Sequence, residues 1–415
     1  MNILIKSAKI IDPNSPFNQS IKDILIEDGF VTKIEDSIPS GDFEIISHEN
    51  LHISPGFFDM RCNFRDPGFE QHEDIASGLR AAERGGFTGV AVMPSTQPVA
   101  DNRSIIENMI RKSNGHNVEL YPIGALSQKS EGLELAEMYD MKQGGGIAFS
   151  DNKKSVKNAN LMSRALLYSK NVDTLIMNSP DDTSISGNGQ INEGVASTLL
   201  GLEGIPSLAE ELTVSRDLFL TNYNNSRIHI GPISSSNSAS MIKEAKREGI
   251  NVTCDIAAHQ LHFLDSDCNS FDTNFKVNPP FRTAEHKNDL IAALKENIID
   301  VITSDHSPWD VEEKQKEFDH AKFGISSIET TFSIALSNLI DIIGLESIIT
   351  KLSINPRSIL KVDLPIVKEG FAANFCLYNP DAKWTPNAEN WISKSKNSPF
   401  IGQELRGVIY QTLKK

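Results

Sequence analysis

The sequence lacks the features that would direct it to a membrane, to nucleic acid or to a secretory route. No run of Lys and Arg occurs among 40 basic and 55 acidic residues, and the formal charge is −15. A phosphate backbone or an anionic membrane is therefore not an expected partner. No eighteen apolar residues follow one another, and the opening MNILIKSAKIID turns polar before a segment of signal length develops. We expect a cytoplasmic protein.

Cysteine is scarce, and the spacing of the cysteines matches no disulfide or metal-binding motif. The chain has four cysteines, Cys62, Cys254, Cys268 and Cys376, and none of them forms a CxxC pair. This spacing suggests neither a disulfide framework nor a cysteine-based zinc site, so reduced thiols are expected. Low-complexity segments and short tandem repeats are also missing, and the chain is long enough, at 415 residues with 39% apolar residues, to bury a large core.

The middle of the chain alternates strand-like and helix-like segments. Strand-like runs such as GVAVMP and NVTCDIA are each followed by an amphipathic pattern with helical spacing, as in SASMIKEAKREG and EHKNDLIAALKEN. This alternation predicts parallel strands with crossover helices, and the number of units suits a (β/α)8 barrel over residues 55–364.

Both ends of the chain differ from the middle. Residues 1–54 contain short alternating segments such as ILIKSAKII and DILIEDGFVTKI, and residues 365–415 return to that pattern in GFAANFCLYNP and ELRGVIYQTLKK. We predict that the two ends pair as one small β-sandwich domain beside the barrel.

Charged side chains stand where barrel strands end. In a parallel barrel the reacting groups lie at the carboxyl ends of the strands. In FFDMRCNFR, Arg61 and Asn63 share the inward face while Cys62 points outward. Asp151 follows the apolar run IAF, and Asp305 follows VIT. Two such carboxylates could hold metal or act as base and ligand, or could simply cap helices and bond to loops.

Other potential metal ligands are interpreted as structural. Cys254, His259 and His262 lie close together in sequence, and His52 and His229 are further candidates. Spacing alone does not bring these groups to one point, and isolated histidines usually satisfy local hydrogen bonds. Similarly, His306 in SDHSP is expected to brace its turn.

Four long segments resemble the dihydroorotases of the longer bacterial type, in the cyclic amidohydrolase superfamily. The segments are PGFFDMRCNFRDPGFEQHEDIASGLRAAERGGFTGVAVMPSTQPVADN, GLEGIPSLAEE, FKVNPPFR and ITSDHSPWDVEEKQKEFDHAKFGISSIET, and they occur in the family's order. The resemblance runs from about residue 2 to 410. It implies a (β/α)8 barrel with a flanking β-sandwich and, in active relatives, a zinc site that hydrolyses or closes a cyclic amide in pyrimidine synthesis.

The resemblance places the family's metal ligands on residues that are mostly unable to bind zinc. The four histidine positions fall on Arg61, Asn63, Asn178 and Pro232. Two carboxylates remain: Asp151 at the bridging position, and Asp305 at the position that binds metal and shuttles the proton. The resemblance also assigns substrate contacts to Arg65 and Asn278, while Ser95 replaces an asparagine and Trp309 replaces a histidine.

These replacements predict a protein without zinc. A catalytic zinc has three or four nitrogen, sulfur or oxygen ligands and lowers the pKa of its bound water from about 16 to about 7. Arginine and proline offer no lone pair, so no cofactor is expected. We hypothesise that the Arg61 guanidinium occupies the metal position and pairs with Asp151 or Asp305. Alternatively, Arg61 extends to solvent.

Three functions are consistent with these residues. The first is a dihydroorotase-like protein without hydrolase activity, in which Asp305 is idle and the chain serves as a structural partner of aspartate carbamoyltransferase; relatives of this shape dock on that enzyme, and a homo-oligomer is expected. The second is an active amidohydrolase with an altered metal site, in which Arg65 and Asn278 hold a carboxylate-bearing substrate. The third is a small-molecule sensor that uses the same pocket.

Overall fold

Eight parallel strands form a nearly closed barrel in the computed structural model, which describes residues 2–415. Their order around the sheet follows the chain, and His306, just after the last strand, bridges to Cys62 of the first. The strands are β6 (Phe57–Cys62), β7 (Phe87–Val92), β8 (Glu119–Gly124), β9 (Ala148–Phe149), β10 (Leu175–Asn178), β13 (Arg227–Ile230), β14 (Asn251–Ala257) and β15 (Val301–Thr303). The predicted barrel is confirmed.

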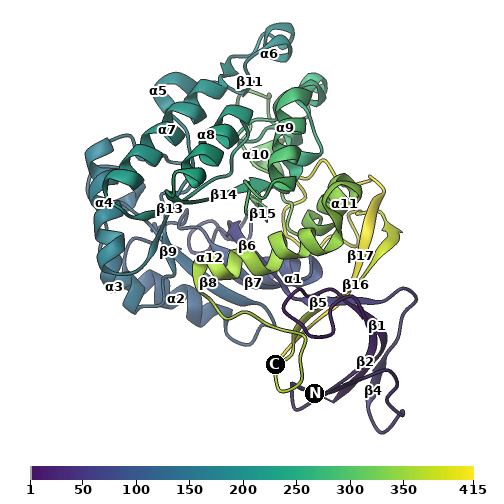
Figure 1. The fold of residues 1–415 in the computed structure, drawn as a ribbon. Helices are drawn as coiled ribbons and strands as arrows, with labels where there is room; N and C mark the ends of the chain where they lie inside the picture. The colour runs from purple at the N-terminus through teal and green to yellow at the C-terminus, as the bar shows by residue number, and fades with distance from the viewer. Residues whose placement is uncertain (1) are drawn as a thin grey trace.

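Helices cover the outside of the barrel (Figure 1). The longer ones are α1 (Ile75–Arg84), α2 (Arg103–Ser113), α4 (Ala159–Asn171), α7 (Ser207–Tyr223), α8 (Ser236–Arg247), α9 (Ala284–Lys295) and α11 (Thr331–Ile349). The shorter helices are α3 (Met138–Gln143), α5 (Thr183–Ser186), α6 (Val195–Leu200), α10 (Val311–Lys314) and α12 (Asn355–Leu360), and a two-stranded ribbon joins β11 (Ile191–Asn192) to β12 (Gly204–Ile205).

Local sequence explains where these helices begin and end. Asp74 accepts a hydrogen bond from the backbone N–H of Ser77 and caps α1, whose Ile75 and Leu79 are buried against the barrel. Beyond α8, Gly249 has a φ of +84°, a conformation that side chains disfavour, and the chain turns there into β14.

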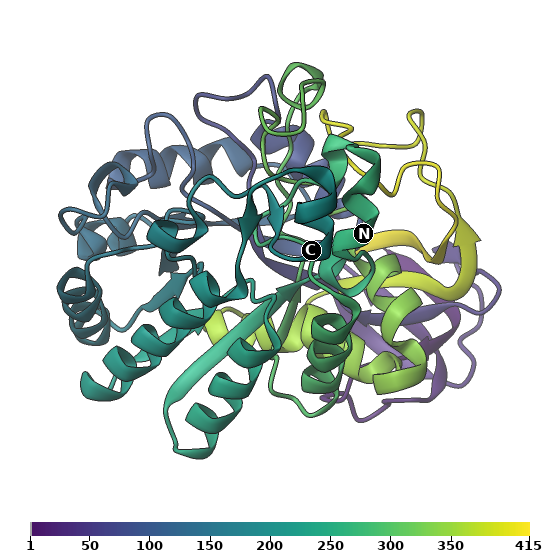
Figure 2. The same cartoon turned by 90° about the horizontal axis from the view of Figure 1, so that it is seen from above.

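The two ends of the chain build a second sheet at one side of the barrel. Its strands are β1 (Ile3–Ile10), β2 (Ile21–Glu27), β3 (Phe30–Glu35), β4 (Glu44–Ile46), β5 (His52–Pro55), β16 (Asn374–Trp384) and β17 (Leu405–Lys414). Strand β5 pairs with β1 on one edge and with β16 on the other, which joins the N-terminal and C-terminal halves. In Figures 1 and 2 the purple and yellow strands lie together beside the barrel.

One helical stretch, Thr331–Leu360, is long and apolar enough to cross a membrane by length and composition, although it is kinked at Gly344, where φ is 76°. It consists of α11, a π-helical turn at Thr350–Ile354 and α12. Here it packs inside the protein: the ring of Phe332 lies 5.0 Å from the rings of Phe57 and Tyr378, and buried Lys351 donates to the carbonyl of Ile299. Its apolar composition therefore serves the contact between the barrel and the second sheet.

Candidate functional site

Arg61 lies at the end of β6 and points into the barrel. Its side chain is fully buried. The Nε atom is 3.4 Å from Oδ2 of Asp255 on β14, and Nη1 donates to Oγ of Ser179, just after β10, at 2.9 Å. Nη2 has no hydrogen-bond partner among residues 2–415. The guanidinium therefore reaches from the first barrel strand to β14, two strands away through β15, and to the end of β10 on the opposite side.

The prediction that Arg61 pairs with Asp151 or Asp305 was wrong. Neither Asp151 nor Asp305 forms an ion pair with Arg61 within 4.0 Å in the described part of the chain; Asp255 does. The alternative, an Arg61 that extends to solvent, is also wrong because the side chain is buried. Asp255 is the fifth residue of a seven-residue strand, so its inward direction follows from the alternation of side chains along β14.

Asp255 is the centre of a small buried charge cluster. Its Oδ2 atom is 2.9 Å from Nε2 of His229 on β13, whose Nδ1 is 2.8 Å from Oγ1 of Thr253. Burial would raise the pKa of Asp255, but the Arg61 guanidinium and the hydrogen bond with His229 outweigh burial, so this pKa lies below its ordinary value. Asp255 is thus an ionised carboxylate that neutralises Arg61.

Asp151 does not face the barrel centre. Its Oδ1 accepts hydrogen bonds from the backbone N–H groups of Leu126 and Ser127, both at 3.0 Å, and its Oδ2 accepts from the Ser127 hydroxyl at 2.5 Å. All three hydrogen bonds come from residues of the neighbouring loop. Burial raises the pKa of Asp151, and the same hydrogen bonds oppose the rise. The side chain is therefore committed to holding the loop after β8.

The next residue, Asn152, occupies the position facing the site. Its Nδ2 donates to Oδ1 of Asn63 at 3.0 Å and to Oγ of Ser95 at 2.8 Å. Asn63 in turn donates to the carbonyl of His306 and to the Ser307 hydroxyl, both at 3.2 Å. A network of amides and hydroxyls, without ionisable groups, fills this part of the barrel mouth.

Asp305 forms an ion pair with a lysine. Its Oδ2 is 2.9 Å from Nζ of Lys153, which also donates to the carbonyl of Asn278 at 2.7 Å. Burial raises the pKa of Asp305, and the nearby cations Lys153 and Arg61 oppose the rise. Burial lowers the pKa of Lys153, against the effect of Asp305. Each charge in this pair offsets the cost of burying the other.

The two remaining ligand positions, Asn178 and Pro232, also offer no metal ligand to the barrel centre. Asn178, at the end of β10, donates through Nδ2 to Oδ2 of buried Asp217 on α7 at 2.5 Å. Pro232 is buried just after β13 and offers no donor atom to a cation. Asn178 therefore ties the end of β10 to α7, and Pro232 supplies no ligand.

Arg65 and Trp309 line a cavity above this network. The Arg65 guanidinium carbon lies 4.0 Å from the centre of the Trp309 ring, and Nε donates to the carbonyl of Pro308 at 3.3 Å. Burial lowers the pKa of Arg65 to about 10, against the effect of Asp305. The cavity measures about 490 Å³. It is lined by Asn63, Arg65, Ser95, Asn152, Lys153, Lys154, Asn278, Asp305, Ser307, Trp309, Lys322, Phe323 and Gly324.

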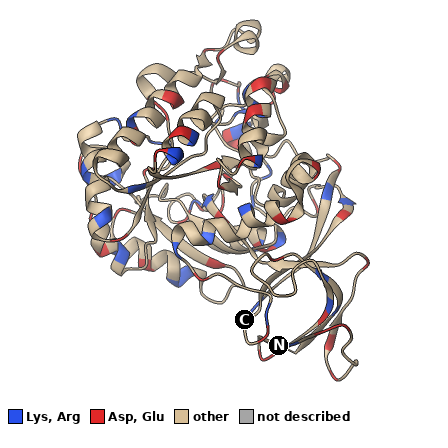
Figure 3. Ribbon diagram, viewed as in Figure 1, with Lys and Arg blue, Asp and Glu red and all other residues tan. Residues whose placement is uncertain are grey.

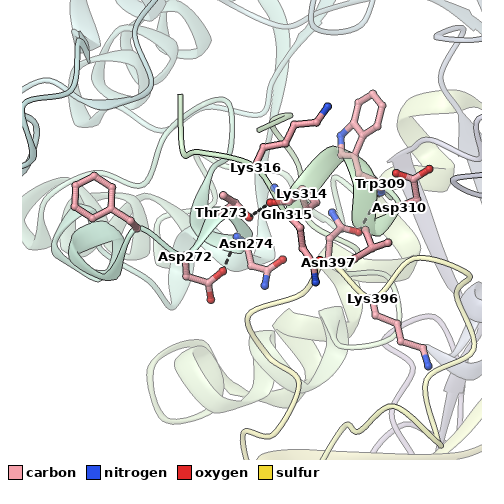
Figure 4. Close-up of a pocket in the computed structure, with 12 residues that line it drawn as sticks. Asp272, Thr273, Asn274, Trp309, Asp310, Lys314, Gln315, Lys316, Lys396 and Asn397 are labelled. Carbon is pink, nitrogen blue, oxygen red and sulfur yellow. Dashed lines mark hydrogen bonds between the residues drawn. The ribbon is translucent and has the colours of Figure 1, made fainter. Parts of the chain in front are cut away.

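A second cavity, of about 530 Å³, shares Trp309 with the first but lies outside the barrel centre (Figure 4). Its walls include Thr273 and Asn274 on one side and Lys316 and Lys396 on others. None of the strand-end residues of β6, β14 or β15 lines it. Of these two cavities, the first is the one lined by residues at strand ends, Asn63 and Asp305.

The local hydrogen bonds expected of the other histidines are present at His52 and His306 but not at His259. Nδ1 of His52 is 2.9 Å from the carbonyl of Asn50, and Nδ1 of His306 accepts from the backbone N–H of Ser327 at 3.1 Å. Both ring nitrogens of buried His259 are without a partner within residues 2–415, and burial lowers its pKa to about 3. This histidine is a neutral core residue.

Zinc, the metal that the resemblance implies, does not fit these residues. Across the described chain, no group of three or more His, Cys, Asp or Glu side chains is placed to hold a metal ion. The nitrogens beside the two inward carboxylates belong to Lys153 at Asp305 and to His229 and Arg61 at Asp255. Lys153 and Arg61 are cations and have no lone pair to donate while charged. One imidazole and two carboxylates that are not placed together fall short of a zinc coordination shell.

Four residues of this network were missed by sequence reasoning: Asn152, Lys153, Ser179 and Asp255. Asp255 could have been found from the parity of NVTCDIA, which places an acidic side chain on the same face as Thr253. Lys153 gives no such signal, because it follows the two-residue strand β9 in a loop whose path the sequence does not define.

Comparisons with known proteins agree with the architecture. A family model described as "Dihydro-orotase-like" matches residues 51–238. A dihydroorotase of Geobacter metallireducens is 39% identical over 100% of this chain and 98% of its own length, and one of Acetivibrio thermocellus is 38% identical over 99% and 97%. The solved L-hydantoinase (dihydropyrimidinase) of Arthrobacter aurescens superposes with a TM-score of 0.85 at 19% identity, covering 100% of this chain and 94% of that one.

Proposed function

The chain belongs to the dihydroorotase family, and from this premise we propose that it is a member without hydrolase activity that serves as a structural partner of aspartate carbamoyltransferase. The single observation that carries the proposal is the Arg61–Asp255 pair. It fills the barrel centre with a buried protein cation whose charge is already balanced. Divalent metal brought to this centre would meet Arg61 and Lys153, and electrostatic repulsion from both would oppose its binding.

The remaining groups supply too little catalysis for an amide. A positioned general base contributes about 10²- to 10⁴-fold, whereas enzymes accelerate reactions by about 10⁶-fold or more. Among residues 2–415, Asp305 is the carboxylate that lines the cavity, and Lys153 donates a hydrogen bond to one of its oxygens. The alternative of an active amidohydrolase with an altered metal site loses Asp151 as a ligand, because this side chain is bound to Ser127.

Retention of the fold supports a structural role. Arg65 and Asp305 hold left-handed backbone conformations, with φ of 61° and 48°, which side chains adopt at a cost of about 1–3 kcal/mol. The surrounding structure therefore holds the barrel mouth in a defined, costly backbone shape, although residues that cannot bind zinc stand at the family's ligand positions. Selection for shape without chemistry would produce this combination. Docking on the carbamoyltransferase comes from the resemblance, and the structure supports it only by preserving the scaffold.

The first experiment measures metal and turnover. We expect protein that has been incubated with zinc and then dialysed to hold far less than one equivalent by elemental analysis, and to show no hydrolysis of dihydroorotate. A variant with Arg61→His, Asn63→His, Asn178→His and Pro232→His should retain more zinc than the unmodified chain. Near-stoichiometric zinc with turnover in the unmodified protein would refute the proposal.

The second experiment tests the partner. The chain and the aspartate carbamoyltransferase of the same organism should co-elute when mixed, and the transferase should gain thermal stability or change its oligomeric state. A matched control is the transferase with an active dihydroorotase of the same family. Separate elution at micromolar concentrations, with no change in the transferase, would remove the structural role.

A sensor is the second candidate, and the charge of the cavity favours it. Four cations, Arg65, Lys153, Lys154 and Lys322, line this cavity with one carboxylate, Asp305. Such a lining suits a small carboxylate, which a guanidinium can bind through two parallel hydrogen bonds. A melting-temperature increase with dihydroorotate that is lost in Arg65→Gln, in protein that binds no transferase, would favour the sensor over the structural partner.

A further inference from the structure

The amine of Lys153 is held inside the cavity at the barrel mouth. The side chain is 27% exposed and lines this cavity of about 490 Å³ together with Asp305. Its Nζ atom donates to Oδ2 of Asp305 at 2.9 Å and to the carbonyl of Asn278 at 2.7 Å. An ammonium group has three N–H donors, and the third has no acceptor within residues 2–415. The nitrogen is therefore fixed in place with one bonding direction left for a ligand.

Asp305 is suited to take a proton from this amine. Lys153 is the one hydrogen-bond donor to the Asp305 carboxylate among residues 2–415, and the Oδ1 atom is buried without a partner. Asp151, in contrast, accepts three hydrogen bonds from its loop. Hydrogen bonds to a carboxylate stabilise its charged form, so a carboxylate with one donor keeps more affinity for a proton. Transfer of the shared proton leaves a neutral lysine amine, which is a nucleophile toward carbonyl carbon.

Arg65 supplies a free guanidinium in the same cavity. Its side chain is buried, its Nε donates to the carbonyl of Pro308, and its guanidinium carbon lies 4.0 Å from the centre of the Trp309 ring. Within the described chain neither terminal nitrogen of Arg65 has a hydrogen-bond partner, and no carboxylate pairs with this side chain. Two parallel N–H groups form the geometry that binds a carboxylate. Arg65 can therefore hold the acidic end of a ligand whose other end reaches Lys153.

The cavity is positive although the chain as a whole is acidic. The charges of Lys153 and Asp305 cancel, and the other cations of the lining, Arg65, Lys154 and Lys322, have no ion-pair partner within 4.0 Å among residues 2–415. Over the rest of the ribbon, basic and acidic residues are interspersed (Figure 3), and the formal charge of the chain is −15. The local excess of cations favours an anionic ligand at this place.

Other buried lysines lack the proton acceptor. Lys276 and Lys314 donate only to backbone carbonyls within residues 2–415. A backbone carbonyl does not take up the proton of an amine, so these two side chains stay hydrogen-bond donors. Lys314 lines the second cavity, which is drawn in Figure 4. Of the three lysines, Lys153 alone combines a carboxylate partner with a position in the cavity of Arg65.

We propose that Lys153 captures small oxo acids as an imine in this cavity, with the carboxylate of the ligand bound by Arg65. The ligand class is a small molecule that carries a ketone or aldehyde carbonyl and a carboxylate. The proposal adds a covalent binding site to the cavity, and it requires neither amide hydrolysis nor contact with the carbamoyltransferase.

The reaction balances with the groups of the cavity alone. The lone pair of neutral Nζ forms a bond to the carbonyl carbon, and the electron pair of the C=O double bond moves to the oxygen, which takes the proton held by Asp305. Asp305 then removes one proton from the nitrogen. In the second step the nitrogen lone pair forms the C=N bond while the C–O bond breaks, and the oxygen leaves as water with the Asp305 proton. An ammonium and a carbonyl have become an iminium and water, so the net charge beside Asp305 is unchanged.

The first test traps the imine on the full chain. Pyruvate with cyanoborohydride, which reduces an iminium to a stable amine, should add one reduced adduct to the intact mass, and peptide mapping should place it on Lys153. Lys153→Arg keeps a cation beside Asp305 but has no primary amine, and it should lose the adduct. Lys243→Arg is the matched control, because Lys243 pairs with Glu296 outside the cavity, and its labelling should equal that of the unmodified chain.

The second test asks whether Arg65 holds the carboxylate. Acetone has the ketone of pyruvate but no carboxylate. Arg65→Gln should lower the ratio of pyruvate labelling to acetone labelling at least about tenfold, because two charge-assisted hydrogen bonds are lost for pyruvate alone. The ratio cancels the different intrinsic reactivities of the two carbonyls and any general loss of stability in the variant.

Adducts spread over surface lysines, or undiminished labelling of Lys153→Arg, would overturn the imine. Peptide mapping of the unmodified chain decides the site even if Lys153→Arg folds poorly. An unchanged labelling ratio in Arg65→Gln would overturn the assignment of oxo acids as the ligand class. Trapping is measured without the carbamoyltransferase and without dihydroorotate, so its failure and the failure of the proposed function are distinguishable.

Discussion

Replacement of Arg61 by methionine is the most direct test of the charge cluster at the barrel centre. Methionine fills a similar volume but removes the cation that balances Asp255. Both side chains of the pair are fully buried, and Asp255 would keep only its hydrogen bond with His229. Breaking a buried ion pair from one side typically costs about 3–5 kcal/mol, because the remaining charge stays in a medium that solvates it poorly.

This cost converts to a measurable change in melting temperature. The entropy of unfolding is about 2.1 cal/mol/K per residue, so a barrel of roughly 300 residues has about 0.6 kcal/mol/K. We therefore expect Arg61→Met to lower the melting temperature by about 5–8 °C at neutral pH, as measured by circular dichroism or calorimetry.

A double variant separates charge from packing. Arg61→Met together with Asp255→Asn removes both charges and lets the new amide keep a hydrogen bond with His229. It should recover most of the lost stability, while Asp255→Asn alone should be destabilised because Arg61 then stays buried and unpaired. The reasoning is refuted if Arg61→Met melts within about 1 °C of the unmodified protein, or if the double variant loses the sum of the two single effects.

The loss of stability caused by Arg61→Met should depend on pH in a defined direction. In the unmodified protein the pKa of Asp255 lies below its ordinary 3.8, so the pair stabilises above that pH and the contribution is lost in acid. In the variant, burial without Arg61 raises this pKa, so Asp255 destabilises once it is ionised. The difference between the two proteins should therefore be small near pH 4 and should grow toward neutral pH.

Two further variants test neighbouring features. Burial raises the pKa of Glu329 to about 7, and backbone hydrogen bonds, including one from Ser393, oppose this rise. The carboxyl group therefore contributes stability that is fully present below the pKa of the unfolded state, near 4.5, and is lost as the pH rises through 7. Glu329→Gln should remove up to about 3 kcal/mol of that pH dependence, measured as melting temperature from pH 5 to 8. A Cβ on Gly231 would lie 2.6 Å from the carboxyl group of Asp255. Gly231→Ala should therefore displace Asp255 from Arg61 and lower the melting temperature by several degrees. An unchanged melting temperature would show that Asp255 does not lie against Gly231 as described.

The architecture could be predicted because its signals are periodic and local. The strand NVTCDIA coincides with β14 at Asn251–Ala257, and helical spacing in SASMIKEAKREG marks α8. Strand β9, in contrast, contains only Ala148 and Phe149, too few residues for a period to be recognised. The path of the chain after β9 therefore had to come from the structure, and that path decides which of Asp151, Asn152 and Lys153 faces the cavity.

The sequence predicted an inward-facing Arg61 paired with a carboxylate, but it did not predict that this carboxylate is Asp255. The sequence indicates that Arg61 points inward and that its charge needs a carboxylate. Which carboxylate it meets depends on distances across the barrel, and periodicity along a single strand does not contain them. Asp151 illustrates the same limit, because its partners Leu126 and Ser127 lie in a loop about 25 residues earlier in the chain, as the hydrogen bonds show.

The charges at the barrel centre follow from electrostatics. Removing imidazoles from a barrel lined with carboxylates leaves buried negative charge, which must be protonated, removed or balanced. This chain balances it twice, with Arg61 against Asp255 and with Lys153 against Asp305. Each protein cation is covalently held and therefore always present, whereas a metal must be acquired. The two ion pairs thus balance the buried carboxylates at the barrel centre without a cofactor, which is compatible with the structural role proposed above.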